Sequence, residues 1–105
     1  MTENLRSYFL EAAGEVLRDG DEPLDRVTAA GVLGTLGDDR FVPLLLAVLE
    51  TDVNRQVQHK VAQAVARIGG TDAEKGLQKL MFAENQYTRY LAAEALADIV
   101  ARGKE

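Results

Sequence analysis

The most constraining feature of the sequence is an internal repeat with a period of about 32 residues. When the chain is shifted by 32 positions, apolar residues fall on apolar residues in two separate segments, and a third copy follows in which the later columns align at a shift of 31. Self-similarity at such a period is typical of proteins that stack one supersecondary unit. The aligned columns are Phe9 with Phe41, Ala13 with Leu45, Val16 with Val48, Leu17 with Leu49, Leu33 with Val65 and Leu36 with Ile68, continued by Ala73, Leu77, Leu80, Met81, Leu96 and Ile99.

Apolar residues recur at helical spacing in six segments, and no segment sustains the alternation typical of a strand. The composition agrees, because the chain has 15 Ala and 14 Leu but only 2 Ile. We expect Asp38 to cap the third helix and Thr71 or Asp72 to cap the fifth. The expected helices are 3–19, 23–36, 39–50, 53–68, 72–83 and 86–102. We predict an all-α fold, a short solenoid of three hairpins at about 3–37, 38–69 and 70–102 within one domain, 1–105.

Length and composition restrict the class of protein. A chain of 105 residues makes one domain with its own core. Without Cys it has no disulfide framework or thiolate metal site, and a single His cannot form a multi-histidine site. A net charge of −5 argues against nucleic-acid binding, which depends on Lys and Arg that neutralise phosphates. No segment has the apolar length of a membrane span or the pattern of a signal peptide. We therefore expect an acidic, soluble, cytoplasmic protein.

The second helix of each hairpin carries a related motif. The three copies read RVTAAGVLGTLG from Arg26, QHKVAQAVARIG from Gln58 and RYLAAEALADIV from Arg89. They resemble the HEAT repeat, in particular the subclass called PBS-lyase HEAT-like, whose second helix reads V-R-x-A-A-x-A-L-G-x-I-G. The segment FVPLLLAVLETD, from Phe41 to Asp52, is similar to the first helix of that subclass. The resemblance covers about residues 5–102 and implies a right-handed α-α superhelix of three HEAT-like hairpins.

The resemblance also implies a ladder of ion pairs along the solenoid, between an Asp in the turn of a hairpin and an Arg early in a second helix. Each repeat of this chain keeps only one half of the pair. Either Asp52 pairs with an Arg of a neighbouring repeat, or Asp19, Asp21 or Glu84 takes a missing place, or these are solvated surface ions worth about 0 to 1 kcal/mol. The turn column holds Gly20, Asp52 and Ala83, and the helix column holds Arg26, Gln58 and Arg89.

The second helices line the concave side of a HEAT-like solenoid, so the resemblance implies that their outward positions contact a partner. Along the chain these positions change from apolar and small, through polar and basic, to aromatic. The candidate partner-binding residues of the concave face are Val27, Gly31, Gln56, His59, Lys60, Gln63, Arg67, Tyr90 and Glu94.

Positive charge gathers in the middle of the chain. Residues 1–50 carry 10 acidic and 4 basic side chains, whereas residues 51–84 carry 4 acidic and 5 basic ones. Arg55, Lys60 and Arg67 would attract a carboxylate or phosphate, and His59 would gain charge below about pH 6.5. We therefore expect a groove for an acidic, partly apolar segment of another protein. The alternative is an ordinary solvated helix surface.

Gly31 lies inside a predicted helix, where a glycine costs about 1 kcal/mol relative to alanine. Either it lets a neighbouring helix or a partner approach closely, or it is simply tolerated.

The last helix carries Tyr87, Tyr90, Leu91 and Val100, and no following repeat is predicted to cover them. An uncovered apolar end favours self-association into a homodimer or docking on a larger protein. In the alternative, the rings lie over their own repeat.

No group of residues predicts an enzyme. His59 and the single serine, Ser7, lie on separate repeats and lack a third residue that would orient them. We therefore expect a non-catalytic protein-binding scaffold, without catalytic residues, metal or cofactor and without nucleic-acid or membrane partners. The resemblance to the lyase subclass gives the alternative, an accessory or regulatory subunit of an enzyme such as a bilin lyase-type complex.

Overall fold

Six α-helices account for most of the chain. The computed structural model describes residues 2–103, and this range contains no strand. The prediction of an all-helical fold with six helices is confirmed. The elements are α1 (Thr2–Asp19), α2 (Pro23–Leu36), the 3-10 turn η1 (Asp39–Phe41), α3 (Val42–Thr51), α4 (Arg55–Ile68), α5 (Thr71–Leu80) and α6 (Gln86–Gly103).

Asp38 organises the entry to the third helix. Its Oδ1 accepts a hydrogen bond from the backbone N–H of Arg40 at 2.9 Å, so Asp38 does cap a helical turn, but not the third helix itself, which is preceded by Phe41. The turn that it caps is η1, and α3 begins only at Val42, three residues later than predicted. The chain therefore changes direction through a tighter turn before the apolar helix starts.

The two helices that follow also begin at residues other than those predicted. The Asn54 side chain accepts a hydrogen bond from the Val57 backbone N–H at 3.0 Å, so α4 begins after Asn54 rather than at residue 53. Helix α5 begins directly after Gly70, whose φ is 90°. The prediction that Thr71 or Asp72 caps α5 is wrong, because both residues already lie inside the helix.

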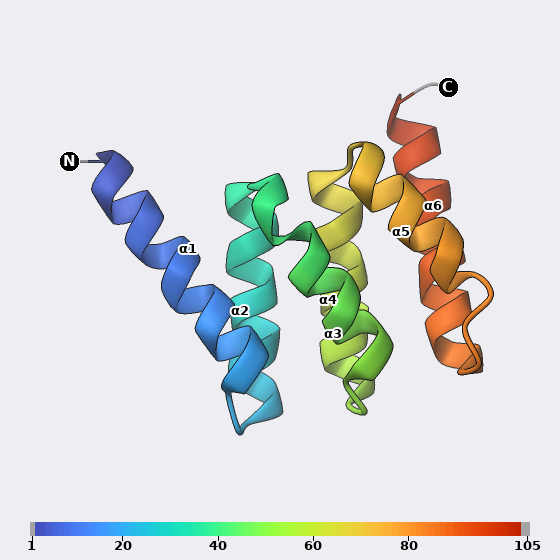
Figure 1. The fold of residues 1–105 in the computed structure, drawn as a ribbon, viewed down its shortest axis with the longest axis horizontal. Helices are drawn as coiled ribbons and strands as arrows, with labels where there is room; N and C mark the ends of the chain where they lie inside the picture. The colour runs from blue at the N-terminus through green and yellow to red at the C-terminus, as the bar shows by residue number, and fades with distance from the viewer. Residues whose placement is uncertain (1, 104–105) are drawn as a thin grey trace.

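The helices form two layers (Figure 1). Helices α1, α3 and α5 lie in one layer, and α2, α4 and α6 lie in the other. Each helix of the first layer packs on the second-layer helix that follows it in the chain, and α4 packs between α2 and α6. The shortest extent of the molecule, 16 Å, fits two layers with helix axes about 10 Å apart.

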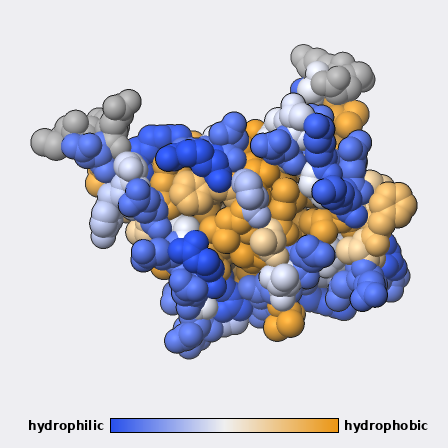
Figure 2. Space-filling model, viewed as in Figure 1, coloured by the Kyte–Doolittle hydropathy of each residue, from blue (hydrophilic) through white to orange (hydrophobic). Residues whose placement is uncertain are grey.

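The core is aliphatic and lies between the two layers. Hydrophobic residues also gather at the middle of the first-layer face, over α3 (Figure 2). Helix α3 is apolar along most of its length because it has a helix on each side. The Phe41 ring packs over Gly14 of α1 and the Leu46 side chain over Gly76 of α5, where a Cβ atom would collide with them. The largest fully buried side chains are Leu10, Leu17, Leu33, Val42, Leu45, Leu49, Val57, Val61, Val65, Leu77, Thr88 and Leu91.

One ion pair joins the first helix pair to the second. Arg26 of α2 donates from Nε to Asp52 Oδ2 at 2.8 Å and from Nη2 to Asp52 Oδ1 at 3.3 Å. The Nη1 group of Arg26 donates to the backbone oxygens of Gly20 and Asp21 at 2.8 and 3.2 Å. The two side chains are only 15% and 9% exposed, and the hydrogen bond to Asp52 raises the pKa of Arg26. Of the alternatives for Asp52, the structure shows pairing with an Arg of the neighbouring helix pair.

The second helix pair is tied to the third by neutral groups. Gln58 has the same position in α4 that Arg26 has in α2, the fourth residue of the helix. Its Nε2 donates to the Leu49 backbone oxygen at 2.9 Å and to Thr88 Oγ1 at 3.2 Å. Gln58 and Thr88 are buried, whereas Arg26 and Asp52 are half-buried, and both junctions hold a satisfied polar contact.

Asp38 gives the fold a pH dependence. Hydrogen bonds from the Arg40 side chain and backbone lower the pKa of Asp38 from 3.8 to about 2. The unfolded state therefore binds a proton more readily than the folded state. The stability that Asp38 contributes is complete above about pH 4 and is lost as the pH falls through about 2.

Replacing Asp38 by Asn tests this assignment. Asn keeps a capping oxygen but loses the charge-assisted hydrogen bonds from Arg40, so we expect Asp38→Asn to lower the free energy of unfolding at neutral pH by about 1 kcal/mol. It should also flatten the decline of stability in acid, because the titrating group is gone. Denaturant unfolding at several pH values measures both effects. Asp39→Asn, at the exposed neighbouring residue, is the control. An unchanged acid slope in Asp38→Asn would contradict the assignment.

Candidate partner-binding groove

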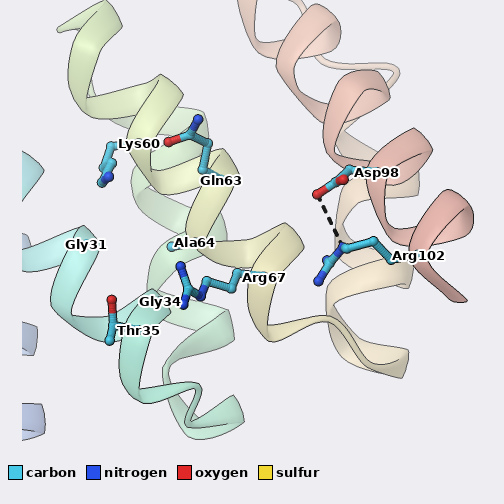
Figure 3. Close-up of a pocket in the computed structure, with 9 residues that line it drawn as sticks. All are labelled: Gly31, Gly34, Thr35, Lys60, Gln63, Ala64, Arg67, Asp98 and Arg102. Carbon is cyan, nitrogen blue, oxygen red and sulfur yellow. Dashed lines mark ion pairs between the residues drawn. The ribbon is translucent and has the colours of Figure 1, made fainter.

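A groove runs between the helices of the second layer and has a volume of about 460 Å³ (Figure 3). Helix α2 contributes small residues, α4 contributes mostly polar and basic ones, and α6 contributes one acidic and one basic residue. We call it the second-layer groove. Its lining residues are Gly31, Gly34, Thr35, Lys60, Gln63, Ala64, Arg67, Asp98 and Arg102.

Three cations and one carboxylate line the second-layer groove. Lys60 and Arg67 come from α4, and neither forms an ion pair with another described residue. Arg102 lies with Nε 3.5 Å from Asp98 Oδ2 (Figure 3). Its Nη2 also donates to the backbone oxygen of Ala66. The groove is therefore positive, although the whole chain has a net charge of −5.

Lys60 also borders a neighbouring cleft of about 450 Å³, which we call the aromatic cleft. The guanidinium of Arg55 lies 4.7 Å from the centre of the Tyr87 ring, the geometry of a cation–π contact. Leu24, at the start of α2, is 72% exposed beside this pair. The aromatic cleft is lined by Leu24, Val27, Arg55, Gln56, His59, Lys60 and Tyr87.

The nine residues predicted to bind a partner lie along or beside three adjoining clefts. The third cleft, of about 380 Å³, lies between α4 and α6. Tyr90 lines none of the three, but it is exposed and its hydroxyl donates to Glu94 Oε2 at 3.1 Å, which raises the pKa of Tyr90. The other eight are Gly31, Lys60, Gln63 and Arg67 in the second-layer groove, Val27, Gln56, His59 and Lys60 in the aromatic cleft, and His59, Gln63 and Glu94 in the third cleft.

Gly31 makes room for the side chain of Lys60. A Cβ atom at Gly31 would lie 3.2 Å from Lys60 Cε, so the lysine stem lies against α2. No backbone atom of the neighbouring helix lies within 4 Å of that Cβ position, so of the two interpretations of Gly31 the structure favours a glycine that is tolerated. The half-buried aliphatic part of the Lys60 side chain holds its ammonium group where the second-layer groove and the aromatic cleft adjoin.

The residues predicted as a docking end do not form one patch. The prediction that Leu91 lies on the surface is wrong. Its side chain is 1% exposed and is part of the hydrophobic core. Tyr87 is half-buried beside Arg55. Tyr90 and Val100 are 54% and 50% exposed, but they are ten residues apart on α6, about 15 Å along the helix.

Arg102 and the close helix contact at Gly34 were not predicted as parts of the site. Arg102 follows Asp98 by four residues, which places both on one helix face, so this spacing would have identified it. Gly34 lies at a close approach of α2 and α4, since a Cβ atom there would lie 3.0 Å from both Cα and Cβ of Ala64. No local sequence pattern reports such a contact between helices.

Comparison with known proteins places this architecture in a family. The family model described as HEAT repeats matches residues 10–97. The chain belongs to the HEAT-repeat family. HEAT repeats commonly mediate protein–protein interaction, and their fold is generally a non-catalytic scaffold. A search of curated proteins found no match.

Residues 2–103 of this HEAT-repeat protein contain neither a cluster of metal ligands nor a membrane-spanning helix. In this range, no three side chains of the His, Asp and Glu types gather closely enough to bind a metal ion. None of the helices described combines the length and the apolar character that crossing a bilayer requires.

Two glycines of α2 provide a matched pair of substitutions. A Cβ atom at Gly31 meets only the flexible end of Lys60, whereas one at Gly34 meets the Ala64 backbone. We expect Gly31→Ala to raise the free energy of unfolding by up to about 1 kcal/mol, since Ala favours the helix. We expect Gly34→Ala to lower it by about 1 to 3 kcal/mol, because α2 and α4 must separate. Urea unfolding measures both, and the reverse order would contradict the packing described.

Proposed function

We propose that this HEAT-repeat protein is a non-catalytic interaction module of the cytoplasm that binds an acidic, partly apolar segment of another protein in the second-layer groove. The observation that supports this most is the grouping of Lys60, Arg67 and Arg102 around one groove in a chain with a net charge of −5. Lys60 and Arg67 have no ionic partner among the described residues, so a partner's carboxylate would meet free charge. Charge complementarity of this kind favours fast and specific association.

The aromatic cleft supports the apolar part of the proposed ligand. It adjoins the groove at Lys60, which lines both. A segment that crosses from one to the other would place its carboxylates beside α4 and an apolar side chain against Leu24 and Tyr87. Burying such a side chain would add a contact that is insensitive to salt.

We further propose that the three helix pairs are HEAT-like hairpins of the PBS-lyase subclass, wound into a right-handed superhelix with the second layer on its concave side. The shared motif supports this, because its first residue, Arg26, Gln58 or Arg89, is the fourth residue of each second-layer helix. Packing of α4 between α2 and α6 would hold the groove rigid, which lowers the entropic cost of binding.

Charge reversal in the groove tests the proposed function. The probes are peptides selected from a random library on the immobilised protein, and we expect them to be acidic with a large apolar residue. The double variant Lys60→Glu, Arg67→Glu should weaken their binding at least about tenfold, or about 1.4 kcal/mol, because attraction becomes repulsion. Fluorescence anisotropy at low and high salt measures the affinity.

The matched control is the double variant Lys75→Glu, Lys79→Glu, which makes the same charge change at exposed residues of α5. It should change the affinity by less than about twofold, since surface charges outside the groove have little effect. Equal losses in both double variants would contradict a role for the groove. Selected peptides without acidic character would overturn the proposed ligand class.

A further inference from the structure

We propose that copies of this chain associate end to end, with the α5–α6 end of one copy stacked on the α1–α2 end of the next. The partner is a second copy of this chain, so this inference is independent of the ligand proposed for the second-layer groove. It rests first on Arg89, whose local geometry repeats that of Arg26.

Arg89 has the same place in α6 that Arg26 has in α2, the fourth residue of the helix. The Nη1 group of Arg26 donates to the backbone oxygens of the residues six and five positions before it, at 2.8 and 3.2 Å. The Nη1 group of Arg89 donates to Ala83 and Glu84, at the same two offsets, at 2.7 and 2.9 Å. Each guanidinium is therefore held in the same way by its own turn.

The two arginines differ in the hydrogen-bond partners of their Nε and Nη2 groups. Arg26 gives Nε and Nη2 to Asp52, which belongs to the next helix pair. Among residues 2–103, no carboxylate accepts a hydrogen bond from Nε or Nη2 of Arg89. A planar guanidinium that is fixed on one side is preorganised to bind a carboxylate on the other. Asp52, which binds Arg26, lies in the turn between α3 and α4, so we expect the carboxylate that binds Arg89 to lie in a turn between two helices as well.

The α1–α2 turn of a second copy carries the required charge. Its residue equivalent to Asp52 is Gly20, which lies between the exposed side chains of Asp19 and Asp21. The two halves of the chain also differ in charge: residues 1–50 hold ten acidic and four basic side chains, and residues 51–105 hold seven acidic and eight basic ones. Stacking the first half of one copy on the second half of another brings unlike charges together.

The two ends of the molecule carry small and apolar residues at the helix positions through which α2 and α4 contact each other. Between α2 and α4, the twelfth residue of one helix, Gly34, lies against the tenth residue of the next, Ala64. The twelfth residue of α6 is Ala97, which is exposed, and the tenth residue of α2 is Val32. Val32 lines an apolar groove of about 310 Å³ between α1 and α2, together with Phe9. In the stack, Ala97 would contact Val32 and the apolar groove would be covered.

The proposed contact joins two different surfaces, so each associated copy keeps one free end. Association of this heterologous kind extends into open chains unless the rotation closes a ring. We therefore expect an average mass that keeps rising with concentration, without the plateau of a symmetric dimer.

Blocking one end at a time tests the proposal. Ala97→Glu adds a charged side chain at the α6 end, and Thr28→Glu adds one at the apolar groove, which Thr28 lines. Both residues are exposed, so the fold should persist, as thermal melting by circular dichroism would verify. In sedimentation equilibrium from micromolar to millimolar concentration, the unmodified chain should grow in mass and each variant alone should stay at 11.4 kDa. An equal mixture should form a 1:1 dimer and nothing larger, because each variant offers the end that the other lacks.

Two more variants complete the design. Arg89→Gln should weaken association about tenfold and still fold, since glutamine already occupies this helix position at Gln58. Val53→Glu, at a residue that is 94% exposed in the α3–α4 turn, should associate like the unmodified chain. A monomer at every concentration would overturn the proposal. So would a mixture that stays monomeric, or either blocked variant that dimerises alone, because both results exclude a head-to-tail contact.

Discussion

The ion pair between Arg26 and Asp52 determines how one helix pair sits on the next. The hydrophobic effect between α2 and α4 is non-directional, so a polar contact of fixed geometry adds to what side-chain packing specifies about the position of one helix against the other. The guanidinium joins the turn before α2 to the turn before α4. Asp52 also accepts a hydrogen bond from the Asn54 backbone N–H at 2.9 Å, and Asn54 caps α4. This polar contact, together with the close packing of Gly34 on Ala64, places the groove residues of α2 and α4 relative to one another.

At the second junction, both members of this pair are replaced together. Gln58 stands where the first junction has Arg26, and Ala83 stands where it has Asp52. A buried charge that loses its partner costs about 3 to 5 kcal/mol, so an arginine facing alanine here would destabilise the fold. Gln58 instead bonds to a backbone oxygen and to Thr88. Accordingly, no buried side-chain nitrogen or oxygen in the described part of the chain lacks a hydrogen-bond partner.

The helices could be predicted from the sequence because helical periodicity reports how each helix packs on the core. The same spacing identified Lys60, Gln63 and Arg67, which lie side by side on one exposed strip of α4. Periodicity does not report which neighbour a side chain meets across two helix pairs. Leu91 shares a column with Lys60, yet it is buried, and Arg102 reaches the backbone of Ala66, 36 residues away. Only the packing of α6 on α4 determines these two placements.

A double-mutant cycle on Arg26 and Asp52 tests most directly whether this pair holds the helix pairs together. The free energy of unfolding is measured for the unmodified chain, Arg26→Ala, Asp52→Ala and the double variant. We predict a coupling free energy of about 1 to 3 kcal/mol. The Asp98–Arg102 pair, whose side chains are 57% and 49% exposed, is the control and should couple by less than about 0.5 kcal/mol. Effects at Arg26 and Asp52 that add within about 0.5 kcal/mol would contradict the central role of the pair.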